Sequence, residues 1–222
     1  MFGGVIKMTG LIHEATKNSG LILTALGQHV LISLTAVTLG ILIAVPAGIV
    51  LSRHKKAATV VLGIFGVINT IPSIVLLGAA MILLGLGFVP AVAVLFLYSL
   101  LPIMRSTYTG ITEINPKYIK AAHGVGMSSL QVLRFVQIPL AVPAIVTGIR
   151  LSTIYIISWA TLSAFIGGGG LGDLIWMGLQ SYNFNLVLCG AIPATMLSLL
   201  ASALLSRLIK ITGKHKSEEV SA

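Results

Sequence analysis

The chain has 222 residues, of which 56% are hydrophobic and only 9% charged, and its mean hydropathy of +1.04 excludes an ordinary soluble domain. Lys and Arg number fourteen against five Asp and Glu, yet the chain lacks the exposed basic face that nucleic acid binding needs, so no nucleic-acid partner is expected. We therefore expect an all-α integral membrane protein embedded in a lipid bilayer. The single cysteine, Cys189, lies in an apolar run and is expected in the core.

Apolar stretches long enough to cross about 30 Å of hydrocarbon predict about five transmembrane helices. Residues 1–29 precede them and show no cleavable signal pattern. They are expected to form an external N-terminal segment with an interfacial helix. Residues 210–222 are expected to form a cytoplasmic tail. The five predicted spans are residues 30–51, 57–86, 88–104, 138–166 and 186–209.

The second stretch is ambiguous because Asn69, Thr70 and Pro72 interrupt it. Its first half, residues 57–68, would rise only about 18 Å as a helix, which is too short to cross alone. We therefore predict one broken span, kinked at Pro72.

Lys and Arg beside spans favour the cytoplasmic side of a membrane. With five spans, ten basic residues that flank them fall on one face, and a split second span would scatter them. The opposite face carries Lys7, Lys17 and Asp173. This pattern predicts an external N-terminus and a cytoplasmic C-terminus. The ten basic residues are Arg53, Lys55, Lys56, Arg105, Lys117, Lys120, Arg134, Arg207, Lys210 and Lys214, with Lys216 beyond them.

Residues 113–139 form one mixed polar interlude on the predicted cytoplasmic side. Asn115 followed by Pro116 is typical of a helix start, because Asn caps the first turn and Pro fits its first position. A short helix is expected over residues 116–123. Gly124 supplies a permissive backbone at its end.

The same interlude predicts a second short helix beyond Gly126. Ser128 and Gln131 have capping-box spacing, so this helix should cover residues 129–136 and end before Pro139. Helices of eight residues are marginal in water, so the pair is expected to pack against a partner. A solvated connector without a special role is the alternative.

The spacing within this loop resembles the signature of ABC importer membrane subunits, in which the loop forms coupling helices that dock into an ATPase. Small residues there let the helix backbone sit close inside a cleft on the partner. Every spacing of the signature is kept, but a Lys stands where the family has an acidic residue, which puts the salt bridge of that residue in doubt. The matching residues are Lys120, Ala121, Ala122, Gly126, Val136, Ile138 and Pro139.

Two further stretches, residues 152–179 and 101–111, are similar to permeases of osmoprotectant importers that carry glycine betaine, choline or carnitine. The resemblance covers roughly residues 30–205 and implies a type I ABC importer permease fold, with residues 30–209 as the permease domain. Methionine-type permeases share the run GGGGLGD, and some relatives handle ergothioneine, so both stay as alternatives.

The run GGGGLGD also contains G-x-G-x-x-G, a phosphate-binding pattern when it joins a strand to a helix. Here it follows a membrane span on the predicted outer face, so nucleotide binding is not expected. The glycines should instead allow a tight turn into a short helix over residues 171–180, with Asp173 at its positive end. This segment is expected to form the outer gate or to meet a binding protein, through Gly169, Gly170, Gly172 and Asp173.

No Walker pattern, catalytic triad or metal-ligand set is found in the sequence. His29 and His123 are too far apart for a metal site, and each is expected at an interface or in solvent. The chain is therefore expected not to be an enzyme and to bind no cofactor. The resemblance implies that ATP and Mg bind at a partner ATPase dimer.

Arg150 is the one charged residue deep in a predicted span, about eleven residues or 16 Å beyond Pro139. A charge at such depth costs about 2.5–3.5 kcal/mol on insertion scales, so it should face a protein interior or wet cavity, or snorkel to the interface. Quaternary ammonium groups are held by aromatic faces. The candidates along the substrate path are Arg150, Tyr98, Tyr108, Tyr155 and Trp159.

The resemblance implies alternating access driven by a separate ATPase, with most of the recognition made by an extracellular substrate-binding protein. One five-span chain is too small to enclose a pathway, so a second copy or a similar permease subunit is expected as partner. A secondary carrier or channel and a membrane scaffold are the rival functional classes. Inverted repeats and midplane acidic residues would favour a carrier, and neither is apparent.

Overall fold

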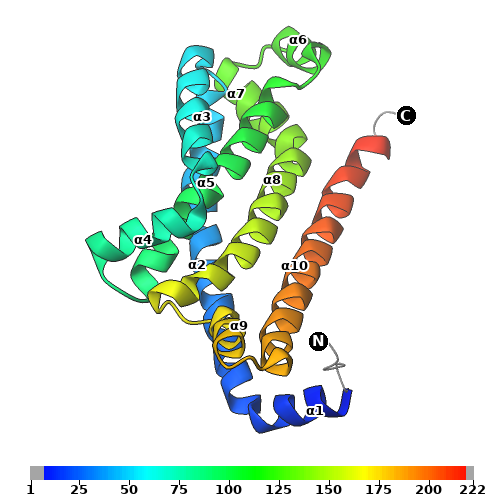
Figure 1. Ribbon diagram of the computed structural model, residues 1–222. Coiled ribbons are helices and arrows are strands. Elements are labelled where there is room, and N and C mark those ends of the chain that lie inside the picture. Colours follow the sequence, from blue (N-terminus) through cyan, green and yellow to red (C-terminus); the bar gives the residue numbers. More distant parts are fainter. Residues whose placement is uncertain (1–7, 219–222) are drawn as a thin grey trace.

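The computed structural model describes residues 8–218, and all regular secondary structure in that range is helical (Figure 1). Lys7, which was assigned to the outer face, and the last four residues of the predicted tail lie outside this range. The helices, in chain order, are α1 Met8–Lys17, α2 Ser19–Leu51, α3 Lys55–Thr70, α4 Ser73–Leu84, α5 Phe88–Thr112, α6 Pro116–Gly124, α7 Ser129–Val132, a π-helical turn Leu133–Gln137, α8 Ile138–Trp159, a 3-10 helix Ala160–Ile166, α9 Leu171–Gln180 and α10 Phe184–Glu218.

Four continuous helical segments in the described range are long and apolar enough to cross a membrane, and α3 with α4 adds a fifth if the bent pair is one span. This confirms the all-α membrane protein with about five spans. The axes of α3 and α4 differ by 94° across Ile71 and Pro72, a sharper bend than the expected kink. Proline fixes an extended backbone here and prevents α3 from continuing.

The first long helix begins at Ser19, eleven residues before the expected start at Val30. Residues 19–29 therefore belong to α2, and only α1 is a separate helix in the N-terminal segment. No formal charge interrupts this stretch, and α2 runs through residues 19–29 and on past Pro46 to Leu51. His29 is fully buried, so the expectation of an interfacial or solvated side chain was wrong.

Close contacts between small residues hold α2, α5 and α8 together. A Cβ at Gly48 of α2 would lie 2.7 Å from Thr107 Cβ of α5, and one at Gly148 of α8 would lie 2.9 Å from the Pro102 oxygen. Such residues let helix backbones approach closely, which replaces the hydrophobic drive that is missing in lipid. Helix α10 packs on α8 and α9, with Cys189 buried as expected.

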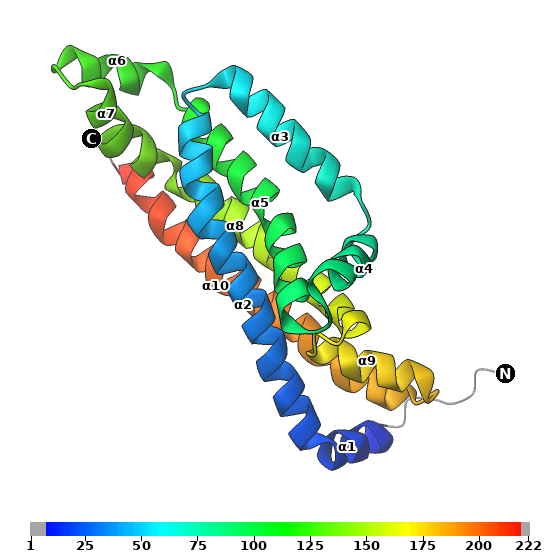
Figure 2. The same ribbon diagram turned by 90° about the vertical axis from the view of Figure 1, so that its left-hand side faces the viewer.

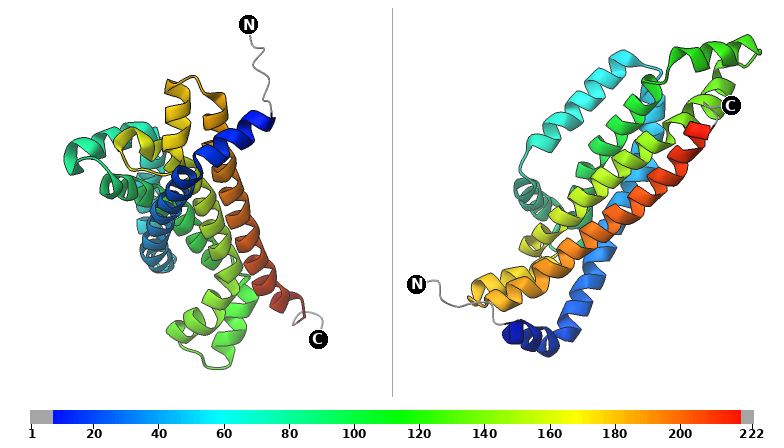
Figure 3. Two further views of the ribbon diagram at one scale, coloured as in Figure 1. Left: turned by 90° about the horizontal axis from the view of Figure 1, so that it is seen from below. Right: turned by 90° about the vertical axis from the view of Figure 1, so that its right-hand side faces the viewer.

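The two ends of the bundle are built differently. Figures 1 and 2 show α6, α7, the α2–α3 connection and the end of α10 at one end, with α1 and α9 at the other. The two views of Figure 3 agree with this arrangement. The basic residues of these segments, Arg53, Lys55, Lys120 and Arg207, thus share an end as expected.

Two boundaries differ from the sequence prediction at this end. Helix α5 continues past Met104 to Thr112. The predicted span ended where the apolar stretch ends, but Arg105 has an exposed side chain and does not interrupt the helix. The second short helix does not end before Pro139 but runs into α8. A π-helical turn carries a bond from Ile138 N to Leu133 O, and this wide turn accommodates the proline ring in the first turn of α8.

Candidate functional site

The coupling loop begins as its sequence predicted. Asn115 caps α6, with its Oδ1 accepting from Lys117 N at 3.0 Å, and Pro116 occupies the first turn. The helix ends at Gly124, one residue later than expected. The turn follows at Gly126, whose φ of +85° is a conformation that glycine adopts without strain. The predicted start and the glycine turn are confirmed.

The second half of the loop is fixed by the expected capping box and by one bond that was not foreseen. Ser128 N donates to Gln131 Oε1 at 2.7 Å, and Gln131 N donates to Ser128 Oγ at 3.4 Å. Arg53 Nη2 donates to Ser129 O at 2.8 Å, which ties α7 to the end of α2. This bond joins the coupling loop to the connection that follows the first long helix.

The residues of the importer signature divide between the inside and the outside of this loop. Lys120 and Ala121 are exposed, whereas Ala122 is buried against the rest of the loop. Val136 and Ile138 are half-buried, and Pro139 is exposed. Large apolar side chains in the same loop are exposed to solvent: Val125 is 77% and Leu130 72% exposed. An exposed apolar surface of this kind is typical of a docking site for another protein.

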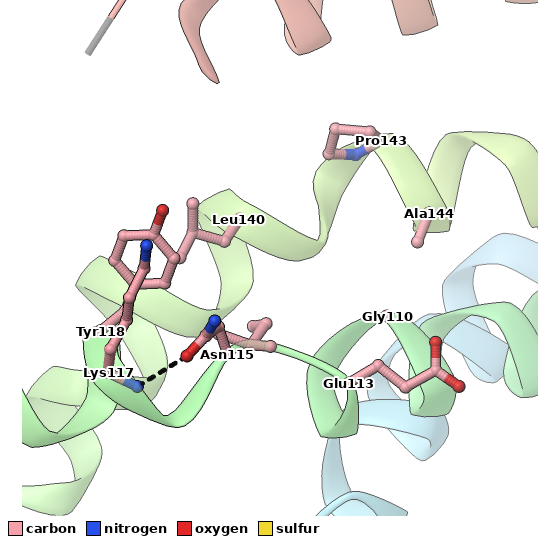
Figure 4. Close-up of a pocket in the computed structure, with 9 residues that line it drawn as sticks. Gly110, Glu113, Asn115, Lys117, Tyr118, Leu140, Pro143 and Ala144 are labelled. Atoms are coloured by element: carbon pink, nitrogen blue, oxygen red, sulfur yellow. Dashed lines mark hydrogen bonds between the residues drawn. The ribbon is translucent and has the colours of Figure 1, made fainter. Parts of the chain in front are cut away.

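A cavity of about 480 Å³ lies at the root of α6, between the ends of α5 and α8 (Figure 4). Figure 4 shows Glu113 extending into the space between α5 and α8, with Lys117 and Tyr118 on the α6 side. Glu113 is the acidic residue of this cavity, but the position where the importer signature has an acidic residue is occupied by Lys120.

Three of the five candidate substrate-path residues meet in one aromatic cluster. The rings of Tyr98 and Trp159 are 4.7 Å apart at 65°, and Tyr155 stacks on Trp159 at 5.6 Å. The Tyr98 hydroxyl donates to Ile71 O at the break between α3 and α4. Tyr108, in contrast, packs in the interior formed by α2, α3 and α5.

Arg150 lies apart from the aromatic cluster. Its Nε donates to Ser202 Oγ of α10 at 3.0 Å, so its guanidinium is held at the contact between α8 and α10. The structure thus satisfies this charge with a neighbouring helix, one of the environments that a charge at this depth requires.

At the opposite end, the glycine run forms the expected turn into α9. Gly169 and Gly170 have φ values of +81° and +94°. Ser163 Oγ donates to Gly169 O at 3.0 Å. Asp173 lies in the first turn of α9 as predicted, and burial raises the pKa of its carboxyl above the ordinary value. The structure thus gathers the four predicted gate residues in one folded corner, and their part in gating stays a prediction. They are Gly169, Gly170, Gly172 and Asp173.

Comparison with known proteins agrees with this arrangement. Residues 36–217 match the family described as binding-protein-dependent transport system inner membrane component. The chain belongs to this family.

Curated relatives align with the permease over nearly its whole length. The choline transport system permease of Bacillus subtilis is 46% identical over 96% of this chain and 100% of the relative. The glycine betaine/carnitine/choline transport system permease of the same organism is 46% identical over 92% and 95%. The carnitine transport permease of Listeria monocytogenes is 43% identical over 90% and 92%.

Solved structures confirm the type I ABC importer permease fold. An inward-facing structure of the MetNI methionine ABC transporter superposes with a TM-score of 0.77, at 21% identity over 87% of this chain and 97% of that one. A crystal structure of an amino acid ABC transporter with histidines gives a TM-score of 0.76, at 22% identity over 89% and 96%.

Sequence reasoning missed two residues that fasten the corner formed by the glycine run and α9. Gly170 N donates to Gln28 Oε1 at 3.1 Å, and His29 Nε2 lies 2.9 Å from Ile157 O. Both side chains leave α2 and reach segments more than a hundred residues away. The one available signal was a polar pair inside an apolar stretch, and the prediction left this pair outside the first span.

Proposed function

We propose that the permease is the membrane subunit of an ATP-driven importer for quaternary ammonium osmoprotectants such as glycine betaine, choline and carnitine. The observation that carries this substrate class is the 46% identity to two Bacillus subtilis permeases whose names state these solutes, over more than nine tenths of each chain. The methionine-type alternative is supported by likeness of fold alone, at 21% identity.

The exposed coupling loop supports docking to a separate ATPase dimer, where ATP and Mg would bind. In this proposal α6 and α7 face the cytoplasm, in agreement with the basic residues at that end. The corner formed by the glycine run and α9 then faces outside, where a substrate-binding protein delivers the solute. The multi-pass chain lies in the cell membrane beside a second copy or a similar permease, and closure of the ATPase alternates access to the path between them.

Transport in proteoliposomes tests the solute and the energy source together. The permease, its ATPase and its binding protein are reconstituted, and uptake of labelled choline, glycine betaine, carnitine, methionine and ergothioneine is measured with and without ATP. We expect uptake of a quaternary ammonium compound that depends on ATP. Uptake without ATP would point to a secondary carrier, and uptake of methionine alone would replace the substrate class.

Thiol labelling tests the orientation independently of transport. Lys120→Cys is placed in a Cys189→Ser background, because Cys189 is the one native cysteine. Lys120 is exposed, so a membrane-impermeant maleimide should label the new thiol in inside-out vesicles and not in intact cells. Labelling in intact cells would place the coupling loop outside and would overturn the docking proposal.

A further inference from the structure

A cavity of about 400 Å³ lies where the second span breaks. Tyr98 of α5 and Trp159 of α8 line it and their rings meet at 65° as an aromatic corner, in which Trp159 is half-buried and Tyr98 is only 1% exposed. The break itself, residues 69–74, forms the facing side, and Leu162 closes one edge. The volume lies within the range of small-molecule sites, about 300–1,000 Å³.

The broken backbone indicates that this cavity is shielded from lipid. Helix α3 has 16 residues and rises about 24 Å, so the break after it falls within the roughly 30 Å hydrocarbon layer if α3 runs across it. Ile71 and Pro72 have extended backbones there. At membrane depth, such backbone persists only inside protein or beside a water-filled cavity. The aromatic corner beside this backbone is therefore shielded from lipid.

The chemistry of the lining selects the ligand. None of the residues that form this cavity carries a formal charge, so neither a carboxylate nor an ammonium group dominates it. A quaternary ammonium group has no hydrogen-bond donor, and the negative face of an aromatic ring attracts it. Tyr155 stacks behind Trp159 and extends the aromatic surface.

We propose that the corner formed by Tyr98 and Trp159 binds the quaternary ammonium group of the solute during its passage through the permease. This inference rests on the proposed function and assigns that function a site. The side chains of Asn69 and Ser73 also line the cavity and supply polar groups for the hydroxyl or carboxylate of the solute.

The site is built for brief occupancy. Two aromatic walls without a carboxylate attract a cation only weakly, which suits a solute that must leave on the far side. Arg150 lies nine residues before Trp159, about 13.5 Å along α8, and its bond to Ser202 directs it towards α10. Its positive charge is thus kept out of the corner.

Uptake by the reconstituted importer tests the corner through the ring of Trp159. Trp159→Leu should lower the ATP-driven uptake rate of the preferred quaternary ammonium compound about two- to thirtyfold, the range that one cation–π contact supports. Trp159→Phe keeps a ring and should retain more of the rate. Phe96→Leu, a ring deletion in the same helix as Tyr98 at a residue that does not line the cavity, is the matched control and should change the rate less than twofold per assembled importer.

Fluorinated tryptophan separates binding from packing, even if Trp159→Leu fails to assemble. Trp176 is the other tryptophan, so the series is made in a Trp176→Phe background. Each added fluorine withdraws electrons from the ring face with little change in shape, and uptake should fall stepwise. A flat response with an active importer overturns the inference alone. Absence of quaternary ammonium uptake by the unmodified importer overturns the proposed function.

Discussion

Replacing Gly172 with alanine probes how tightly the corner formed by the glycine run and α9 is packed. Gly172 lies in the first turn of α9, and a Cβ added there would sit 2.7 Å from the carbonyl carbon of Thr161 and 3.0 Å from its Cα. Carbon atoms prefer about 3.5–4.0 Å. The obstacle is the backbone of the 3-10 helix, which no side-chain rotation can move. Helix α9 must therefore shift by roughly 1 Å.

Two effects of opposite sign compete in this variant. Alanine is a better helix former than glycine by about 1 kcal/mol. Overpacking costs about 1–3 kcal/mol, and contact with a rigid backbone places Gly172→Ala near the upper end of that range. The steric effect wins, with a net loss of roughly 2 kcal/mol. For a chain of this length, that loss lowers the melting temperature by about 4–8 °C.

Thermal denaturation of the purified importer, followed by the loss of its size-exclusion peak, measures this change. The matched control is Gly66→Ala in α3, where an added Cβ meets nothing within 4 Å in this chain. The control should melt at or slightly above the temperature of the unmodified protein. If Gly172→Ala melts as high as the control, the close contact between α9 and Thr161 is not present in the protein.

Two further outcomes are expected. Ala121→Glu should raise the ATP hydrolysed per solute imported about tenfold or more, because a bulky charge at this exposed position blocks docking of the ATPase. A loss of about 1.4 kcal/mol in the free energy of docking is enough for a tenfold effect, and the melting temperature should not change. Equal coupling would exclude Ala121 from the ATPase contact. The raised pKa of Asp173 means that the folded parent binds the proton more tightly than its unfolded chain does, so the parent loses stability as pH rises from 4 to 7. Asp173→Asn lacks this group and should therefore gain stability relative to the parent over the same range. Melting curves that stay parallel across this pH range would refute that.

Sequence reasoning succeeded where a feature depends on neighbouring residues. The structure contains three features that depend only on residues close together in the chain. They are the capped start of α6, the glycine turn at Gly126 and the capping box of Ser128. The broken second span was predicted for the same reason, since Pro72 acts on the residues beside it. The match of 113–139 to a signature of fixed spacing gave the family that the comparisons confirm.

Sequence reasoning failed where one segment meets a distant one. Gln28 and His29 were left outside the first predicted span, yet a glycine amide and a backbone oxygen over 120 residues away are their partners inside the bundle. Pro139 looked like a helix stop, but the π-helical turn absorbs it. Neither outcome follows from local pattern, because the partner or the compensating turn is set by packing.

The amino-acid sequence by itself determined the membrane setting, the number of spans, the polar coupling loop and the end at which basic charge gathers. These follow from hydropathy, charge and turn chemistry, which act along the chain. Tertiary structure alone decided that Tyr98 and Trp159 meet beside the break, while Arg150 turns towards α10. The physical reason is that helix packing fixes which face of each span looks inward, and small residues such as Gly48 and Gly148 set how closely those faces approach.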